Sequence, residues 1–206
     1  MTRGARRQEW SVSVEKSWAP ELIDKKSLLE ELARYVPGDE AEAASLAKIR
    51  DLLTRAADPF TRKQTEHVTA SAVVARPDAS AFLLVHHRRL DRWLQPGGHI
   101  EPEDESTLAA ALREAREETG IESLQAPLRD RILDLDVHPI PAFPDRPPHV
   151  HFDLRYVATT LGDPPPHPSD EVLAACWFGL PEALAAGVDA SLGRALKKAK
   201  ALLAAP

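Results

Sequence analysis

Cysteine is almost absent from this chain of 206 residues, because Cys176 is the only one. A single cysteine excludes an intrachain disulfide, so we expect a cytoplasmic protein. No apolar run approaches the roughly 18 residues that a membrane span requires. The basic N-terminus is not followed by the apolar segment of a secretory signal. We therefore expect no membrane partner.

An excess of positive charge is also missing, since the formal net charge is -6. Nonspecific binding to nucleic acid needs a basic surface, so we expect no nucleic-acid partner. The acidic balance does not exclude a phosphorylated small molecule, because a bound metal ion can reverse the charge of a site locally.

The hydrophobic pattern changes near residue 60. Apolar residues at helical spacing predict two helices, over 20–36 and 39–57, within an N-terminal extension that spans residues 1–60. This helical hairpin can cap the following domain, pair two chains, or shape a substrate pocket.

Residues 61–206 read as a domain of strands interleaved with helices, which is typical of an α/β or α+β fold. The predicted strands are 68–75, 81–87, 132–140, 149–159 and 172–178. The predicted helices begin at about 104, 181 and 190 and end at 119, 186 and 204.

Residues 93–121, WLQPGGHIEPEDESTLAAALREAREETGI, are the most informative segment. A Gly-Gly turn precedes a predicted helix on which Glu114, Glu117 and Glu118 share one face, because residues three and four apart are neighbours. Each like-charge pair costs about a few tenths of a kcal/mol on an exposed helix. A hard divalent cation such as Mg²⁺, which prefers oxygen ligands, would relieve this repulsion. The alternative is a solvated acidic face interleaved with arginines.

This segment resembles the Nudix box, the signature of the Nudix hydrolases. Arg113 to Ile121 match its second half in register, and Glu105 stands eight positions before Arg113, as in the box. The chain departs in two places. Gly98 lies seven positions before Glu105, so the loop has one extra residue, and Ala115 is smaller than the usual aliphatic residue. The resemblance implies a Nudix-like α/β/α sandwich around a mixed sheet for residues 61–206.

The resemblance also implies a function. Nudix hydrolases cleave the phosphoanhydride (pyrophosphate) bond of a nucleoside diphosphate derivative or related nucleotide, with Mg²⁺ or Mn²⁺ as cofactor. It implies that Glu117 and Glu118 are the main metal ligands and that Glu114 supports them. The backbone carbonyl of Gly98 can add a ligand, and Arg113 can pair with Glu117 or with Glu105.

A different class of function is a catalytically inactive Nudix-like module that senses a nucleotide metabolite. Such modules commonly lose box carboxylates, whereas this chain keeps all three, which favours the enzyme. In both cases the partner is a small nucleotide-type molecule. A homodimer is a tendency of the family, and the sequence leaves the oligomeric state open.

The general base is open at this stage. Glu101 follows a predicted short strand and is a catalytic base, an extra metal ligand or a solvated residue. Glu171 lies late in the chain, where some Nudix enzymes carry their base, and is a second candidate.

Histidine is the second unusual feature, because seven of the eight lie on predicted strands or at their ends. His149 and His151 are two apart, so both point to one sheet face. Such a row can line a polar cleft, contact substrate or ligate a transition metal. We expect substrate contacts from residues near the glycine pair and on this row: Gly97, Gly98, His99, Arg88 and His151. Trp93 either packs in the core or stacks on a base.

Overall fold

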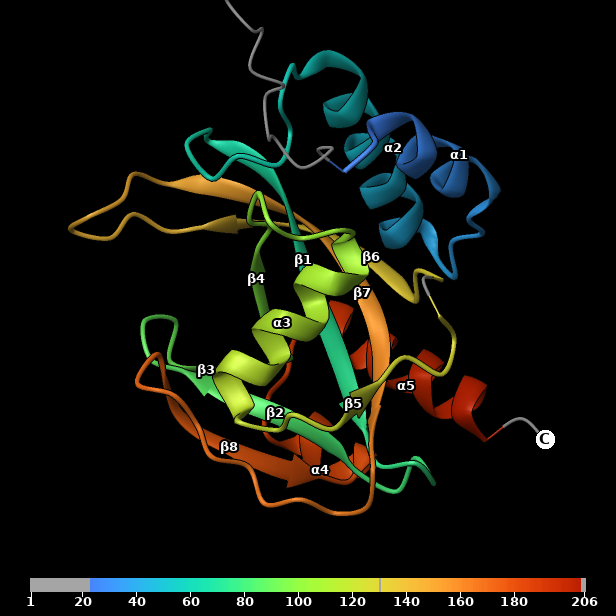
Figure 1. Cartoon of the computed structure of the whole chain (residues 1–206), viewed down its shortest axis with the longest axis vertical. Coiled ribbons are helices and arrows are strands. Elements are labelled where there is room, and N and C mark those ends of the chain that lie inside the picture. The colour runs from blue at the N-terminus through green and yellow to red at the C-terminus, as the bar shows by residue number, and fades with distance from the viewer. Residues whose placement is uncertain (1–22, 130, 205–206) are drawn as a thin grey trace, which may run out of the picture.

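The computed structural model describes residues 23–129 and 131–204 (Figure 1). Residues 1–22 of the predicted extension, with the first residues of the helix predicted at 20–36, lie outside the described part. The other predicted helices and strands are all present, with ends that differ by a few residues. Within the two described ranges, no helix combines the length and the apolar character that crossing a membrane requires.

A single sheet of eight strands forms the centre of the molecule (Figure 1). Its strands are β1 (Glu66–Ala75), β2 (Phe82–His87), β3 (Arg92–Leu94), β4 (Gly97–His99), β5 (Leu124–Gln125), β6 (Asp134–Ile140), β7 (His149–Thr160) and β8 (Val172–Phe178). β1 runs parallel to β7 and antiparallel to β2 and β4. β5 and β6 pair with β7, and β3 and β8 pair with β2, all antiparallel. The sheet is therefore mixed, as expected.

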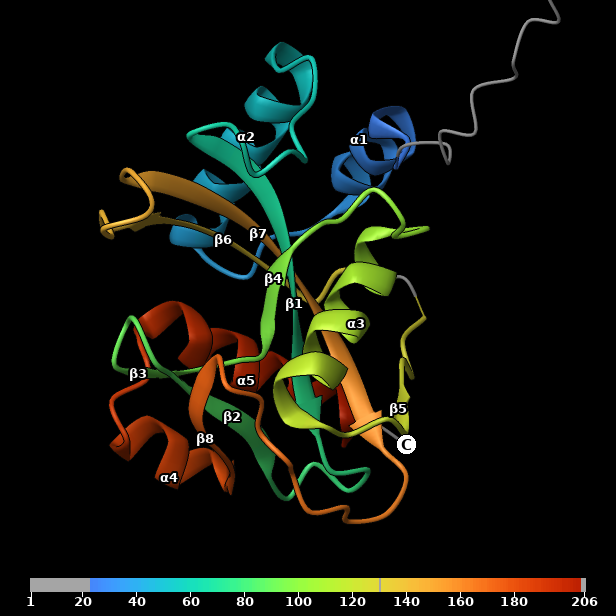
Figure 2. The same ribbon diagram turned by 60° about the vertical axis from the view of Figure 1, so that its left-hand side comes forward.

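Helices cover both faces of this sheet (Figures 1 and 2). They are α1 (Lys25–Arg34), α2 (Glu40–Arg55), α3 (Thr107–Thr119), α4 (Leu180–Ala185) and α5 (Ala190–Leu203). Successive side chains of a strand point to opposite faces. In β1, Val68, Ala70 and Val74 accordingly join a core cluster with α1, α2 and α3, whereas Val73 and Ala75 join a second cluster with α4 and α5. The expected α/β/α sandwich is confirmed.

The two N-terminal helices share the core of the sheet. Asp24 and Asp39 cap them, since each carboxylate accepts hydrogen bonds from backbone N–H groups of the first turn. Leu32 and Ile49 are fully buried in the same cluster as β1. The buried carboxylate of Glu42 in α2 accepts a hydrogen bond of 2.5 Å from the Lys198 amine of α5. The two N-terminal helices therefore pack on the sheet as part of its core.

Candidate active site

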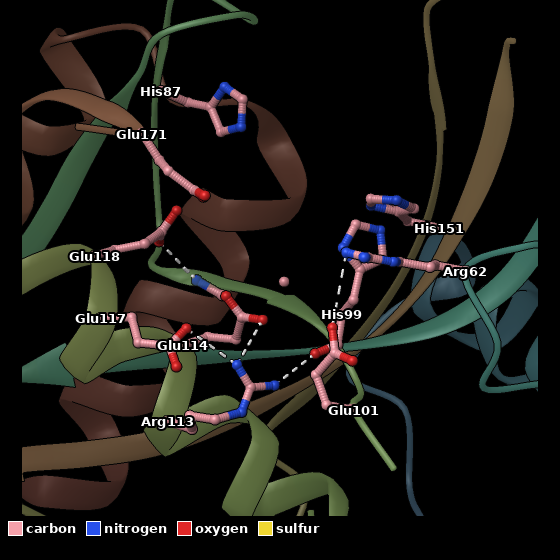
Figure 3. A pocket seen from close by; sticks show the side chains of 12 residues that line it. Arg62, His87, His99, Glu101, Arg113, Glu114, Glu117, Glu118, His151 and Glu171 are labelled. Carbon is pink, nitrogen blue, oxygen red and sulfur yellow. Dashed lines mark hydrogen bonds and ion pairs between the residues drawn. The ribbon is translucent and has the colours of Figure 1, made fainter. Parts of the chain in front are cut away.

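A pocket of about 260 Å³ opens between α3, β4 and the neighbouring strands (Figure 3). One side carries the carboxylates of α3 together with Glu171, and the opposite side carries Arg62, His99 and His151. Glu101, His87, Arg113 and the glycine pair complete the lining. None of the described residues that line it belongs to α1 or α2.

Helix α3 is positioned by the caps that its sequence predicts. The Ser106 hydroxyl accepts a hydrogen bond from the Ala109 N–H at 3.0 Å. Gly120 ends the helix with a φ of 67°, a left-handed conformation that favours glycine. These two caps fix where the helix begins and where it ends.

The buried side of α3 consists of alanines more than of the larger apolar residues Leu108 and Leu112. Ala110, Ala111 and Ala115 are fully buried, whereas the two leucines are only partly buried. Alanines allow the helix to lie close to the sheet, where larger side chains would not fit. The small residue at position 115, a departure from the usual box, therefore suits this packing.

The glycine pair lies in a strand, which corrects the expected Gly-Gly turn. Gly97 and Gly98 belong to β4 and pair with Ser71 and Ala70 of β1. A Cβ atom on Gly98 would lie 2.6 Å from Oε2 of Glu114, and one on Gly97 would lie 2.3 Å from Cβ of Ser71. Glycine is needed here because β4 passes between α3 and β1 with no room for a side chain.

The three box carboxylates sit at different depths, although their spacing places them on one side of the helix. The Glu117 side chain is 60% exposed and that of Glu114 is 15% exposed. Glu118 is buried, and its Oε2 atom accepts a hydrogen bond of 3.0 Å from the Gly97 N–H. Burial, assisted by Glu114 and Glu171, raises the pKa of Glu118 to about 8. Burial also raises the pKa of Glu114 against the effect of Arg113.

Arg113 fastens the loop before α3 to the carboxylates. Its guanidinium donates to both carboxylate oxygens of Asp104, at 3.0 and 2.9 Å, and to the His99 carbonyl oxygen at 2.8 Å. It also pairs with Glu114 and with Glu117, the latter at 3.1 Å, so one of its two expected partners is present.

The other expected partner of Arg113, Glu105, is exposed. Asp104 takes its place, and it stands six positions after Gly98, the spacing of the first half of the box. The extra residue of the loop therefore lies between the acid that binds Arg113 and the helix. Sequence reasoning missed Asp104, although its distance from Gly98 was a usable signal.

The other expected site residues lie in different places. Glu101 lines the pocket, and its carboxylate is 3.7 Å from the guanidinium of Arg62. Glu171 lines the same pocket beside Glu118 (Figure 3). Arg88 is not among the lining residues, and its Nε atom donates to the Asp170 carbonyl oxygen. Trp93 stacks on a neighbouring histidine at 5.0 Å between ring centroids and packs on the core, away from the pocket.

Two lining residues were not singled out from the sequence as contacts. His87 ends β2, and only its place on a strand end marked it. Arg62 lies in the connection between α2 and β1, where no periodic pattern exists. Both reach the pocket because the sheet brings the ends of several strands together.

The donor set suits a hard divalent cation. Glu114 and Glu118 are carboxylates whose pKa values burial raises, and the guanidinium of Arg113 is shared among several acids. A doubly charged ion with oxygen ligands stabilises the ionised form of such groups.

The same burial predicts how the stability of the metal-free protein depends on pH. A carboxyl whose folded pKa is raised stabilises the fold fully below its ordinary pKa of 4.5, and this contribution is lost as the pH rises through about 8. We expect the free energy of unfolding in chelator to fall by on the order of a few kcal/mol across this window relative to Glu118→Gln. Urea unfolding of both proteins from pH 5 to pH 9 measures the difference.

Buried histidines do not confuse this comparison. Burial lowers the pKa of His67 to about 4 and that of His99 to about 3. The two histidines therefore change the free energy of unfolding mainly below their ordinary pKa of 6.5, and they are present in both proteins. Parallel pH profiles for wild type and variant would show that Glu118 does not titrate in this window.

Comparisons with known proteins place most of this chain in one family. A family model described as the NUDIX domain matches residues 65–199, which excludes α1 and α2. An ADP-ribose pyrophosphatase of Mycobacterium tuberculosis is 33% identical over 132 residues, which are 60% of this chain and 58% of that protein. The chain therefore matches little more than half of that relative's length.

Solved structures agree in fold. The Ap4A hydrolase of C. elegans, in a binary complex, superposes with a TM-score of 0.53 and 25% identity over 66% of this chain and 97% of its own. The NUDIX domain of Shewanella oneidensis NrtR has a TM-score of 0.50 over 84% of this chain and 97% of its own. At 20% identity, the second likeness concerns the fold alone. Since the family match extends over most of the sheet and both of its faces, the chain belongs to the Nudix domain family.

Proposed function

We propose that this protein is a metal-dependent pyrophosphohydrolase, which cleaves the phosphoanhydride bond of a nucleoside diphosphate derivative or related nucleotide. One observation supports it above all. Glu114, Glu117 and Glu118 converge on the glycine strand of one pocket, and two of them are largely buried. Burying ionisable carboxylates side by side is costly unless a cation joins them.

The residues of this chain divide the work of such a reaction. Glu114, Glu117 and Glu118 would hold Mg²⁺ or Mn²⁺, with the backbone carbonyl of Gly98 beside them. When bound, the ion neutralises pyrophosphate oxygens and lowers the pKa of a bound water. Arg113 keeps the carboxylates in place, since it joins α3 to Asp104.

Proton transfer and substrate binding fall to the rest of the lining. Glu101 and Glu171 are the two lining carboxylates outside α3, and either can accept the proton of the attacking water. Arg62 and His99 lie across the pocket from the carboxylates and can contact the anionic part of a substrate (Figure 3). Glu101→Gln and Glu171→Gln, assayed separately for kcat, identify the base.

Adenosine phosphoanhydrides are the first substrates to test. The relative that is 33% identical is an ADP-ribose pyrophosphatase, and the one that is 25% identical is an Ap4A hydrolase. Both names denote compounds with a nucleotide linked through a phosphoanhydride. The carboxylates of this pocket suit the cleavage of that bond, and they do not select the group that is attached to the phosphoanhydride.

A substrate panel tests the proposal directly. ADP-ribose, Ap4A and nucleoside triphosphates are incubated with the full-length protein in Mg²⁺, in Mn²⁺ and in chelator, and mononucleotide and phosphate products are quantified. We expect turnover of at least one compound with metal and none in chelator. Glu103→Gln, which removes an exposed carboxylate of the same loop outside the pocket, is the control with unchanged turnover. Tight binding of a compound by folded protein, with no turnover under any condition, would establish the sensor instead.

A further inference from the structure

Three histidines from three strands meet beside the carboxylates. His67 lies on β1, His99 on β4 and His151 on β7, and one ligand nitrogen from each lies within 4.8 Å of the other two. Their ring centroids are 4.9 to 5.4 Å apart. His67 and His151 are register partners across the parallel pair, and β4 is hydrogen-bonded to β1 on its other side. The sheet itself therefore holds the cluster together.

Hydrogen bonds leave the Nε2 atoms of two of these rings as acceptors. The Nδ1 atom of His67 lies 2.9 Å from the Gln64 carbonyl oxygen, which can only accept, so Nδ1 carries the proton. The Nε2 atom of His99 lies 2.9 Å from Nη1 of Arg146, which can only donate. Both Nε2 atoms therefore face Arg146 as acceptors, and both rings are neutral in this arrangement.

The third ring has a nitrogen with no hydrogen-bond partner. Nε2 of His151 is buried and makes no hydrogen bond to any of the described residues. A buried polar atom without a partner is uncommon and costs free energy. An ion held by the three rings would give this nitrogen a partner.

The proton positions on the rings suit a metal ion better than an anion. To bind a phosphate, His67 would have to donate from Nε2 while Nδ1 already donates to Gln64, which needs a charged ring in a buried place. Binding a metal uses the lone pairs of the neutral rings, once Arg146 has moved away from them. The guanidinium of Arg146 already faces Nε2 of His99 at 2.9 Å and Nε2 of His67 at 3.4 Å. A metal ion would take its place, and Arg146 would move with the loop between β6 and β7.

We propose that His67, His99 and His151 form a second metal site, distinct from the carboxylates of α3, which binds Zn²⁺. Three imidazoles suit zinc, whereas Mg²⁺ prefers oxygen. Tetrahedral bonds of about 2.1 Å place ligand nitrogens roughly 3.4 Å apart, so modest side-chain rotations close the site. The Nδ1–H bond from His67 to a backbone carbonyl is the outer contact that zinc-bound histidines usually make. His99 and His151 line the pocket, so the fourth position opens toward the substrate.

Metal binding in the presence of excess Mg²⁺ tests this site without reference to activity. Full-length protein is stripped with chelator, loaded with Mg²⁺ and titrated with Zn²⁺ by calorimetry, and the metal content is measured after desalting. We expect one zinc ion per chain. His99→Ala and His151→Ala should each weaken zinc binding by about tenfold or more, as the loss of one of three protein ligands demands. Glu118→Gln should leave zinc binding unchanged.

The control is His167→Ala, because His167 is exposed and lies outside the pocket. It should bind zinc like the wild type. Circular dichroism verifies that each variant is folded, and His67 is left intact because it is fully buried. X-ray absorption of the zinc-loaded protein should show imidazole scattering. Folded wild type that takes up no zinc, histidine variants that bind it as well as wild type does, or scattering from carboxylates alone would each overturn the proposal.

Discussion

Glu118→Gln is expected to lower kcat on the best substrate of the panel by about a thousandfold, equivalent to about 4 kcal/mol of transition-state stabilisation. Its carboxylate is the most deeply buried of the three on α3, and the Gly97 N–H holds it in place. The amide of glutamine has nearly the same shape but carries no charge. The substitution therefore removes the charge of a proposed metal ligand, and the amide oxygen can still accept the hydrogen bond from the Gly97 N–H.

The same variant should be more stable than the wild type when metal is absent. At pH 8 the wild-type protein either keeps a proton on Glu118 or buries a negative charge near Glu114 and Glu171. Glutamine does neither. We expect a higher melting temperature in chelator, and no further rise when Mg²⁺ is added. A residue that destabilises the empty site and is needed for turnover is the signature of a ligand retained for function.

Glu117→Gln provides the matched comparison. Its side chain is 60% exposed and pairs with Arg113, so the metal-free stability should change little while kcat still falls. Comparing the two variants distinguishes the effect of burial on stability from the effect of metal binding on kcat. Both residues are expected to bind the ion, and only Glu118 is buried. Turnover by Glu118→Gln within a few-fold of the wild type, in folded protein, would refute its role as a ligand.

Strands with a long run of regularly patterned residues were predictable from the sequence, and strands of two or three residues were not. β6, β7 and β8 lie within two residues of their predicted limits, because each contains five or more residues of apolar or alternating pattern. β3 and β5 have three and two residues, which is too short for any periodicity. The sequence predicts a turn at the glycine pair because glycine usually marks one. The place of the pair in β4 depends on how close α3 lies, which the local sequence does not show.

The sequence was sufficient to predict which carboxylates line the site, and insufficient to predict how deeply each of them is buried. The spacing of Glu114, Glu117 and Glu118 places them on one side of a helix, and they do line one pocket. How deeply these carboxylates are buried depends on which side of α3 packs on the sheet. Alanines rather than leucines make that contact. The histidine cluster depends on the parallel pairing of β1 with β7, which joins residues 84 positions apart and has no signature in the sequence of either strand.

The largest effect on stability is expected at Arg155, whose side chain is only 2% exposed in the middle of β7. Its guanidinium lies 3.2 Å from Asp134, 3.1 Å from Asp136 and 3.2 Å from Asp153. Arg155→Met keeps most of the volume and removes the cation. Because breaking a buried ion pair leaves charges without compensation, we expect a loss of about 3–5 kcal/mol in the free energy of unfolding. Urea denaturation measures it.

In Arg155→Met, Asp153 loses its cation, whereas Asp134 keeps two others. Asp134 also pairs with Arg194 at 2.8 Å and with Lys198 at 3.3 Å, whereas Arg155 is the only cation within ion-pair distance of Asp153 among the described residues. Adding Asp153→Asn to Arg155→Met should therefore recover part of the loss, and a double-mutant cycle gives the coupling between the two residues.

Arg55→Met is the matched control for this experiment. Arg55 also pairs with two carboxylates, those of Asp51 and Glu66, but its side chain is 48% exposed. Solvent screens such pairs, so we expect a much smaller loss of stability than for Arg155→Met. If the two methionine variants lost equal stability, the buried arginine would contribute no more than a surface one. In that case the three aspartates would have to be accommodated by their hydrogen bonds, such as those that Asp153 accepts from Thr69 and Ser71.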